Sequence, residues 1–351
     1  MFRGFPVRRS VSLAALAAAA LLASCAQPPP AKPSPPPPIS LSSQLLEQAS
    51  AYRAYIAKAA QISPAFANGQ QVADSLRAGA SYQPDQLLRG AIAYGAVAAL
   101  QDPAFVAGVR AYANDPAQRQ KVAFEIMKDP AYVLGIAGAS SAAGQVVSAL
   151  GDDGRKLLDQ GRLVKQAAYD VQRSSWSKSE VSGREARLLQ TKQLSSTPAL
   201  GETAETQRLQ QASVGAAPLG LVGAPAGPPY SPLVVRSLAL AALAGLGYAD
   251  DANLNQVLPL VAEPNTATCL NMSKLNLYQC LAVSKPHYED VFCLGVHAMS
   301  DTGACLMKGV GVTVPADPIV EAAKARAAEA AAAKAAKTAK KPAAKKKTKK
   351  G

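Results

Sequence analysis

The chain has 351 residues, of which 49% are hydrophobic and 5% aromatic, and its formal net charge is +13 at pH 7. Alanine is abundant while β-branched runs are rare, which favours helices over sheets. Eight of the net positive charges fall in residues 316–351 and three in residues 1–24, so the basic character belongs mainly to the tail and not to the body.

The first residues predict an export signal. A basic leader with Arg3, Arg8 and Arg9 precedes an apolar run from Val11 to Leu22. This run is too short for a membrane-spanning helix, which needs about 20 apolar residues. We therefore interpret residues 1–24 as a signal peptide, whose removal leaves enough chain for one or two domains with real cores.

The apolar run ends in Leu22-Ala23-Ser24-Cys25, where small residues precede a thiol. This stretch resembles the lipobox of bacterial lipoprotein precursors. The resemblance implies cleavage before Cys25 and lipidation of Cys25 with chains such as palmitate, and Ala26 after it implies sorting to the outer membrane. An ordinary secretory signal and a twin-arginine signal at Arg8-Arg9 are the alternatives. We expect a lipid-anchored protein whose body faces the periplasm.

Residues 25–40 combine this anchor with a proline-rich linker, PPPAKPSPPPPIS. Proline favours an extended polyproline rod of about 3.1 Å per residue, so the linker would hold the body roughly 40 Å from the bilayer. A disordered spacer without a set length is the alternative. Both place the body in the periplasm.

Residues 41–195 predict a helical domain. Apolar residues recur three or four apart in residues 42–62 and again in residues 83–101, which is typical of amphipathic helices. Asp-Pro pairs at residues 102, 115 and 129 predict helix starts, because aspartate accepts bonds from first-turn amides and proline suits the first helical position.

The second half of this domain predicts three further helices. A segment rich in small residues, 132–150, is the candidate for a central helix. After Gly151-Asp152-Asp153-Gly154 a separate polar helix is expected from Arg155 to about Trp176. Ser182 and Glu185 have the spacing of a capping box before a third helix.

Residues 196–231 are rich in glycine and proline and predict a linker between two domains. In residues 232–315 we expect a second helical domain, which contains the remaining cysteines. It begins with an apolar core helix capped by Ser231-Pro232, and a following short helix is expected to bend or break at Pro259.

Four cysteines, Cys269, Cys280, Cys293 and Cys305, lie within 37 residues. In an exported domain they are expected to form two disulfides, because that compartment is oxidising. Three connectivities exist. A pair eleven residues apart on one helix would be about 16 Å apart, beyond disulfide reach, so 269–280 is disfavoured. A helical hairpin turning at Pro286 favours the nested pairs 280–293 and 269–305.

A metal site or a thiol enzyme is the alternative for this region. Cys293 and His297 are four residues apart on the expected helix and could share a zinc ion, although an oxidised Cys293 cannot ligate. The chain has no other catalytic or phosphate-binding motif. We therefore expect no enzyme activity, no cofactor and no metal.

The tail, residues 316–351, begins as an alanine-rich helix and ends in dense lysine, where repulsion and Pro342 favour disorder. Its composition resembles the tails of linker histones and bacterial histone-like proteins, which implies phosphate binding by counterion release. Nucleic acid is not an expected partner of an exported protein, which would instead meet peptidoglycan or lipopolysaccharide. The candidate binding residues are Lys340, Lys341, Lys345, Lys346, Lys347, Lys349 and Lys350.

Together these features predict an all-α lipoprotein: a helical bundle with a disulfide-stapled hairpin, between a disordered proline-rich segment and a disordered tail. The expected role is a non-enzymatic envelope scaffold or adaptor, joined to the membrane by lipid and to anionic polymers by the tail. A periplasmic helical module that binds an apolar or cell-wall ligand is the first alternative. A metal- or thiol-dependent enzyme using Cys293 and His297 is the second.

Overall fold

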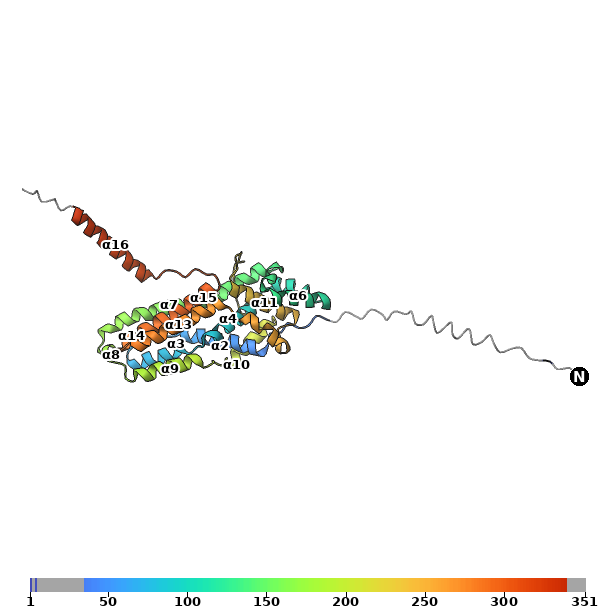
Figure 1. The fold of residues 1–351 in the computed structure, drawn as a ribbon, viewed down its shortest axis with the longest axis horizontal. Coiled ribbons are helices and arrows are strands. Elements are labelled where there is room, and N and C mark those ends of the chain that lie inside the picture. Colours follow the sequence, from blue (N-terminus) through green and yellow to red (C-terminus); the bar gives the residue numbers. More distant parts are fainter. Residues whose placement is uncertain (2–3, 5–34, 340–351) are drawn as a thin grey trace, which may run out of the picture. The chain divides into compact units, whose positions relative to one another are not determined.

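The computed structural model describes residues 1, 4 and 35–339 of the chain, and helices dominate the described part (Figure 1). The first helices are α2 (Ser43–Ala60), α3 (Gly69–Ala80), α4 (Pro84–Ala99), α5 (Pro103–Arg110), α6 (Pro116–Lys128), the 3-10 helix η2 (Pro130–Gly135), α7 (Ala139–Asp170), η3 (Val171–Arg173), α8 (Ser175–Lys178) and α9 (Arg184–Ser196). The others are α10 (Thr203–Ser213), α11 (Pro232–Leu246), η4 (Asp251–Asn253), α12 (Leu254–Val257), η5 (Leu258–Val261), α13 (Pro264–Val283), α14 (His287–Cys293), the π-helix η6 (Leu294–Ser300), α15 (Asp301–Gly309) and α16 (Pro318–Ala339). The predicted all-α class is confirmed.

Three helices begin at the predicted Asp-Pro pairs. Asp102 accepts a hydrogen bond from the Phe105 amide at 2.8 Å, and Asp115 and Asp129 each accept from the amide two residues further on, at 2.9 and 3.0 Å. The following proline occupies the first helical position, where no N–H partner is needed. The predicted starts of α5, α6 and η2 are confirmed.

The long helix α7 differs from the prediction of two helices separated by Gly151-Asp152-Asp153-Gly154, because it runs through these residues without a break. Gly154 lies where α15 crosses, and a Cβ on Gly154 would be 2.8 Å from the Gly303 carbonyl oxygen. Asp153 is buried and accepts bonds from Arg53 Nη1 at 2.8 and 2.7 Å on its two oxygens. Four residues that are typical of a turn therefore serve helix packing and a buried ion pair.

The π-helix η6 adjusts the packing of α14 and α15 on α7. A Cβ on Gly295 would lie 2.4 Å from the backbone nitrogen of Lys165, and one on Gly303 would lie 2.5 Å from the backbone oxygen of Gly154. These two glycines are eight residues apart, which on a regular helix would rotate them about 80° away from a common face. A π turn takes up an additional residue, so both glycines can face α7.

Helix α4 is buried on almost every side and occupies the centre of the fold between α2, α7 and α11. A Cβ on Gly90 would meet the Gln48 oxygen of α2 at 2.4 Å, and one on Gly95 would meet Ser237 Oγ of α11 at 2.4 Å. Small residues therefore let the backbones of α2 and α11 approach α4 closely. The sequence predicted a central helix in residues 132–150, but in the structure α4 occupies the centre of the fold.

Residues 41–195 and 232–315 share a single hydrophobic core, rather than forming the two domains that we expected. The expected linker between them contains α10 and a segment that lies alongside α7. In this segment the Ala226 amide donates to the Ser140 oxygen at 3.0 Å, and the Val222 oxygen accepts from Ser148 Oγ at 2.9 Å. A Cβ on Gly223 would lie 2.3 Å from the Gly144 oxygen. The glycines in this segment allow close packing between the two halves.

Two smaller predictions have different outcomes. The capping box at Ser182 is absent, because the residue before α9 is Gly183 with a φ of +67° and no side-chain cap bond, and α9 packs on α3 and α13. The predicted break at Pro259 is confirmed, since α12 ends at Val257 and a 3-10 helix follows.

Among the described helices none is alone long and apolar enough to cross a bilayer, and only the pair α4–α5, bent by 87°, meets that test by length and composition.

Candidate functional site

The four body cysteines form two disulfides within the stapled hairpin, by which we mean residues 264–309 (α13, α14, η6 and α15). Cys269 is bonded to Cys305 and Cys280 to Cys293, with a Cα–Cα distance of 5.7 Å in both. The chain reverses direction at Pro286, so the inner pair lies near the turn and the outer pair near the open end. The predicted nested pairing is confirmed.

This pairing bears directly on the zinc alternative. The Cys293 sulfur is bonded to Cys280, so Cys293 offers no thiolate to a metal ion. His297 Nδ1 lies 2.8 Å from Asp301 Oδ2, and the His297 carbonyl oxygen accepts a bond from Ser273 Oγ at 2.6 Å. Within the described chain there is no group of three or more His, Cys, Asp and Glu side chains that could hold a metal ion.

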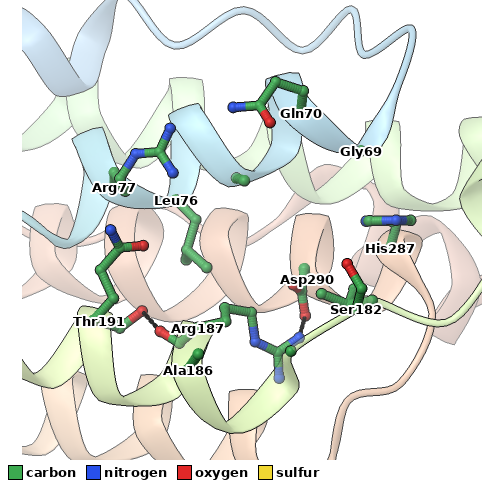
Figure 2. Close-up of a pocket in the computed structure, with 14 residues that line it drawn as sticks. Gly69, Gln70, Leu76, Arg77, Ser182, Ala186, Arg187, Thr191, His287 and Asp290 are labelled. Carbon is green, nitrogen blue, oxygen red and sulfur yellow. Dashed lines mark hydrogen bonds and ion pairs between the residues drawn. The ribbon is translucent and has the colours of Figure 1, made fainter.

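A polar cleft that the sequence analysis did not predict lies between α3, α9, α14 and the loop before α9 (Figure 2). Its volume is about 530 Å³. Segments separated by more than a hundred residues meet there, since α3 contributes Arg77, α9 contributes Arg187 and α14 contributes Asp290. No local motif marks such a cleft, so only the tertiary packing reveals it.

The floor of the cleft is a buried ion pair between Arg187 and Asp290, whose side chains are 9% and 3% exposed. Arg187 also donates to the Leu281 oxygen, and Ser284 Oγ donates to Asp290 at 2.7 Å. Burial raises the pKa of the Asp290 carboxyl, and the attraction of Arg187 opposes this rise. The Arg187 Nε atom is buried and has no hydrogen-bond partner among the described residues.

The rim of the cleft carries further polar groups. Arg77 forms an ion pair with Asp74, which also accepts a bond from Gln70 Nε2 at 3.1 Å. Three other side chains that line the cleft make no hydrogen bond within the described chain: Ser182, Gln190 and His287, the last of which contacts the Trp176 ring. These donors and acceptors are available to a polar ligand.

Packing fixes the His287 ring at one end of the cleft. The ring lies against Gly69, where a Cβ would be 2.3 Å from the nearest ring atom. The Trp176 ring centroid is 6.2 Å from that of His287, and the His287 amide donates to the Ser179 oxygen at 3.3 Å. Glycine at position 69 therefore makes room for the imidazole at the start of α3.

A buried lysine lies outside the cleft. Lys274 Nζ donates to the Ala80 oxygen at 2.6 Å and to Ser195 Oγ at 3.0 Å, and it lies 3.5 Å from the centre of the Tyr82 ring. Burial lowers the pKa of Lys274 well below its ordinary value. Lys274 and Ser195 are 3% and 4% exposed, so solvent and substrates do not reach this amine–hydroxyl pair, and we assign it to the core.

A second hollow of about 410 Å³ lies beside the inner disulfide. Tyr169, Tyr288 and Phe292 line it, with Val283 at its edge, so its surface is mainly apolar. The Tyr169 and Phe292 rings meet edge to face with centroids 6.3 Å apart. Nothing in the described chain covers Val283, which is 75% exposed.

The remaining predicted site residues lie at the two ends of the chain. Cys25 is outside the described residues, and so are the seven candidate binding lysines: Lys340, Lys341, Lys345, Lys346, Lys347, Lys349 and Lys350. Helix α16, which leads to these lysines, is exposed on all sides from residue 318 to residue 335. Its start is joined to the body by an ion pair between Lys165 and Asp317 at 3.0 Å.

No protein-family model, curated protein or solved structure matches this chain. The described features that remain for a functional proposal are the two disulfides, the polar cleft and the exposed helix α16.

Proposed function

We propose that this protein is a non-enzymatic lipoprotein of the outer membrane that acts as an envelope scaffold or adaptor. Cys25 carries the lipid anchor, and the lysines of residues 340–350 adhere to anionic polymers such as peptidoglycan or lipopolysaccharide. The body between them acts as a spacer that sets the distance between membrane and polymer.

The disulfides support an exported location. Disulfides persist in oxidising compartments such as the bacterial periplasm and are rare in reducing cytosol. Two bonds within 37 residues of a helical hairpin fit the first environment. They agree with an export signal at residues 1–24, which comes from the sequence alone.

The exposure of α16 is the observation that carries the adaptor proposal. An alanine-rich helix of 22 residues is about 33 Å long and behaves as a semi-rigid spacer. None of its described side chains is buried, so it contributes nothing to the core. A helix of this kind is suited to hold the lysines that follow it away from the body.

The two junctions between the body and its ends lie far apart along α7. On one side, Arg110 donates to the Pro37 oxygen, and the neighbouring Gly108 packs against Ala137, just before α7 begins. On the other side, Asp317 pairs with Lys165, which is 26 residues past the start of α7 and therefore about 39 Å along it. This separation suits a protein that connects the membrane at one end to an anionic polymer at the other.

Co-sedimentation with purified peptidoglycan tests adhesion. The mature protein should bind at low salt and dissociate at high salt, because exposed charges are screened. Replacing the seven lysines of residues 340–350 by alanine should abolish binding, whereas replacing them by arginine should retain it. Equal binding by the alanine variant and the unchanged protein would refute adhesion through the tail.

Labelling with radioactive palmitate tests the anchor. The unchanged protein should incorporate the label and fractionate with the outer membrane, because several acyl chains make anchoring stable. The Cys25→Ser variant should take up no label and leave the membrane fraction. Unlabelled wild-type protein in the soluble fraction would contradict lipidation while leaving adhesion by the tail open to its own test.

A further inference from the structure

The polar cleft between α3, α9 and α14 has an unmet donor at its floor. Arg187 uses its two terminal nitrogens on Asp290 and on the Leu281 oxygen, while its buried Nε atom has no partner in the described chain. A buried donor without a partner is unfavourable, because it has lost its hydrogen bonds to water. A ligand that brings an acceptor to this atom would replace a lost hydrogen bond. Figure 2 shows the Arg187 side chain lying between α9 and α14 with its guanidinium directed at Asp290.

The charges around the cleft favour an anionic ligand. Arg77 and Arg187 line it, and Asp290 is the only carboxylate among the lining residues, so these three side chains carry a net charge of +1. Asp74 pairs with Arg77 from outside the cleft; the Asp74 side chain is 56% exposed and the Arg77 side chain 39%, so solvent screens both charges. Arginine is well suited to bind carboxylates because its planar donors match their two oxygens.

The other lining groups favour a peptide rather than a simple anion. Gln70 and Gln190 bring amide groups that can bond to peptide N–H and C=O groups. Ala73, Leu76 and Ala186 provide small apolar surfaces that suit methyl-sized side chains. A volume of about 530 Å³ lies within the usual range for small-ligand pockets.

We propose that this cleft binds the carboxylate end of a short peptide with small side chains. The carboxylate accepts from the Arg187 Nε atom, Arg77 adds positive charge at the rim, and the peptide groups lie along Gln70 and Gln190. This proposal depends on neither the lipid anchor nor the lysine tail. Two sources have this chemistry, the stem peptide of peptidoglycan with D-residues and the C-terminus of a protein with L-residues.

The stapled hairpin holds this cleft in place. Asp290 belongs to α14, which the disulfide between Cys280 and Cys293 joins to the end of α13. Leu281, whose oxygen accepts from Arg187, directly follows Cys280, and Ser284, whose hydroxyl donates to Asp290, is four residues after Cys280. The inner disulfide therefore fixes the groups that position Arg187.

Isothermal titration of the detergent-purified mature protein, with both disulfides intact, tests the proposal. The probes are N-acetyl-D-alanyl-D-alanine, N-acetyl-L-alanyl-L-alanine and the C-terminal amide of each. We expect saturable binding of at least one acid and at least tenfold weaker binding of its amide, which corresponds to about 1.4 kcal/mol. Preference for the D,D acid assigns the site to cell-wall peptides, and preference for the L,L acid or equal binding assigns it to protein C-termini.

Three variants connect binding to the cleft. Arg77→Gln should weaken binding of the acid about tenfold, and Ala186→Phe should abolish it by filling the cleft. Arg187→Lys keeps a cation beside Asp290 but removes the Nε donor, and it should also lose binding. The controls are Arg89→Gln and Ala204→Phe, which change an exposed arginine and an exposed alanine outside the cleft and should bind as the unchanged protein does.

Three results would overturn the proposal. The first is no saturable binding of either acid up to about 10 mM, a concentration that would reveal affinities of only a few kcal/mol. The second is equal binding of acid and amide. The third is unchanged binding by folded Arg77→Gln and Ala186→Phe, with folding verified by circular dichroism.

Discussion

The stapled hairpin and the group of α2, α4 and α11 solve the same packing problem by different means. Both bury helices at short separations, and both use glycine where backbones approach. The hairpin adds two covalent bonds, whereas α2, α4 and α11 contain no cysteine and are held together by non-covalent packing alone. The stability of the hairpin should therefore depend mainly on whether the disulfides are reduced. The stability of the three-helix group should depend mainly on side-chain size.

The largest effect is expected from removing the disulfides. The entropy of loop closure predicts that removing the Cys269–Cys305 bond, which closes the longer loop, lowers the free energy of unfolding by about 4 kcal/mol. Removing Cys280–Cys293 should lower it by about 3 kcal/mol. Paired Cys→Ser variants in urea denaturation measure both losses. A larger loss from the shorter loop would show that native packing at the inner bond, and not loop closure, dominates.

A smaller effect is expected from Gly90→Ala in α4. The new Cβ would lie 2.4 Å from the Gln48 oxygen and 2.6 Å from Tyr52 Cβ, so α2 must move. Overpacking of this kind lowers the free energy of unfolding by about 1–3 kcal/mol. The matched control is Gly135→Ala, where nothing lies within 4 Å of the new atom. Equal stability of the two variants would mean that α2 and α4 are not closely packed.

Lys274→Met should change how stability depends on pH. Burial lowers the folded-state pKa of Lys274, while the unfolded chain keeps a value near 10.4. Between these two values the unfolded chain binds more protons, so the stability of the wild type rises with pH by up to about 1.4 kcal/mol per unit. The methionine variant lacks this contribution. Its free energy of unfolding, measured by chemical denaturation, should therefore fall relative to that of the wild type between pH 7 and pH 10. A constant difference would contradict burial of the Lys274 amino group.

The smallest effect is expected at the junction of α16. The Lys165–Asp317 pair is partly exposed, so Lys165→Met should change the free energy of unfolding by about 1 kcal/mol or less. Hydrogen exchange should nevertheless accelerate at the Ile319 amide, which Asp317 caps at 2.9 Å. Unchanged exchange there would mean that the ion pair does not hold the start of α16.

The sequence predicted what depends on local chemistry. Asp102, Asp115 and Asp129 act through the amides next to them, so their helix starts followed directly from their positions. The nested disulfides followed from cysteine spacing and the turn at Pro286, because helix geometry excludes bonding between Cys269 and Cys280.

Features that depend on distant contacts were not predicted. Gly and Asp, the residue types at 151–154, are typical of turns, but in the structure α15 crosses at Gly154 and Arg53 pairs with Asp153 within the continuous helix α7. The cleft depends on residues of three helices far apart in the chain, and the partner of Arg187 is 103 residues away. Spacing rules contain no information about such pairs.

We propose that the body matures in an oxidising compartment, and the oxidation state of its cysteines in living cells is the most direct test. Growing cells are treated with a membrane-permeable alkylating agent, and the intact mass of the protein is measured before and after reduction. We expect Cys269, Cys280, Cys293 and Cys305 to stay unmodified until a reductant is added, when all four react. Alkylation of these four cysteines without reductant would contradict it.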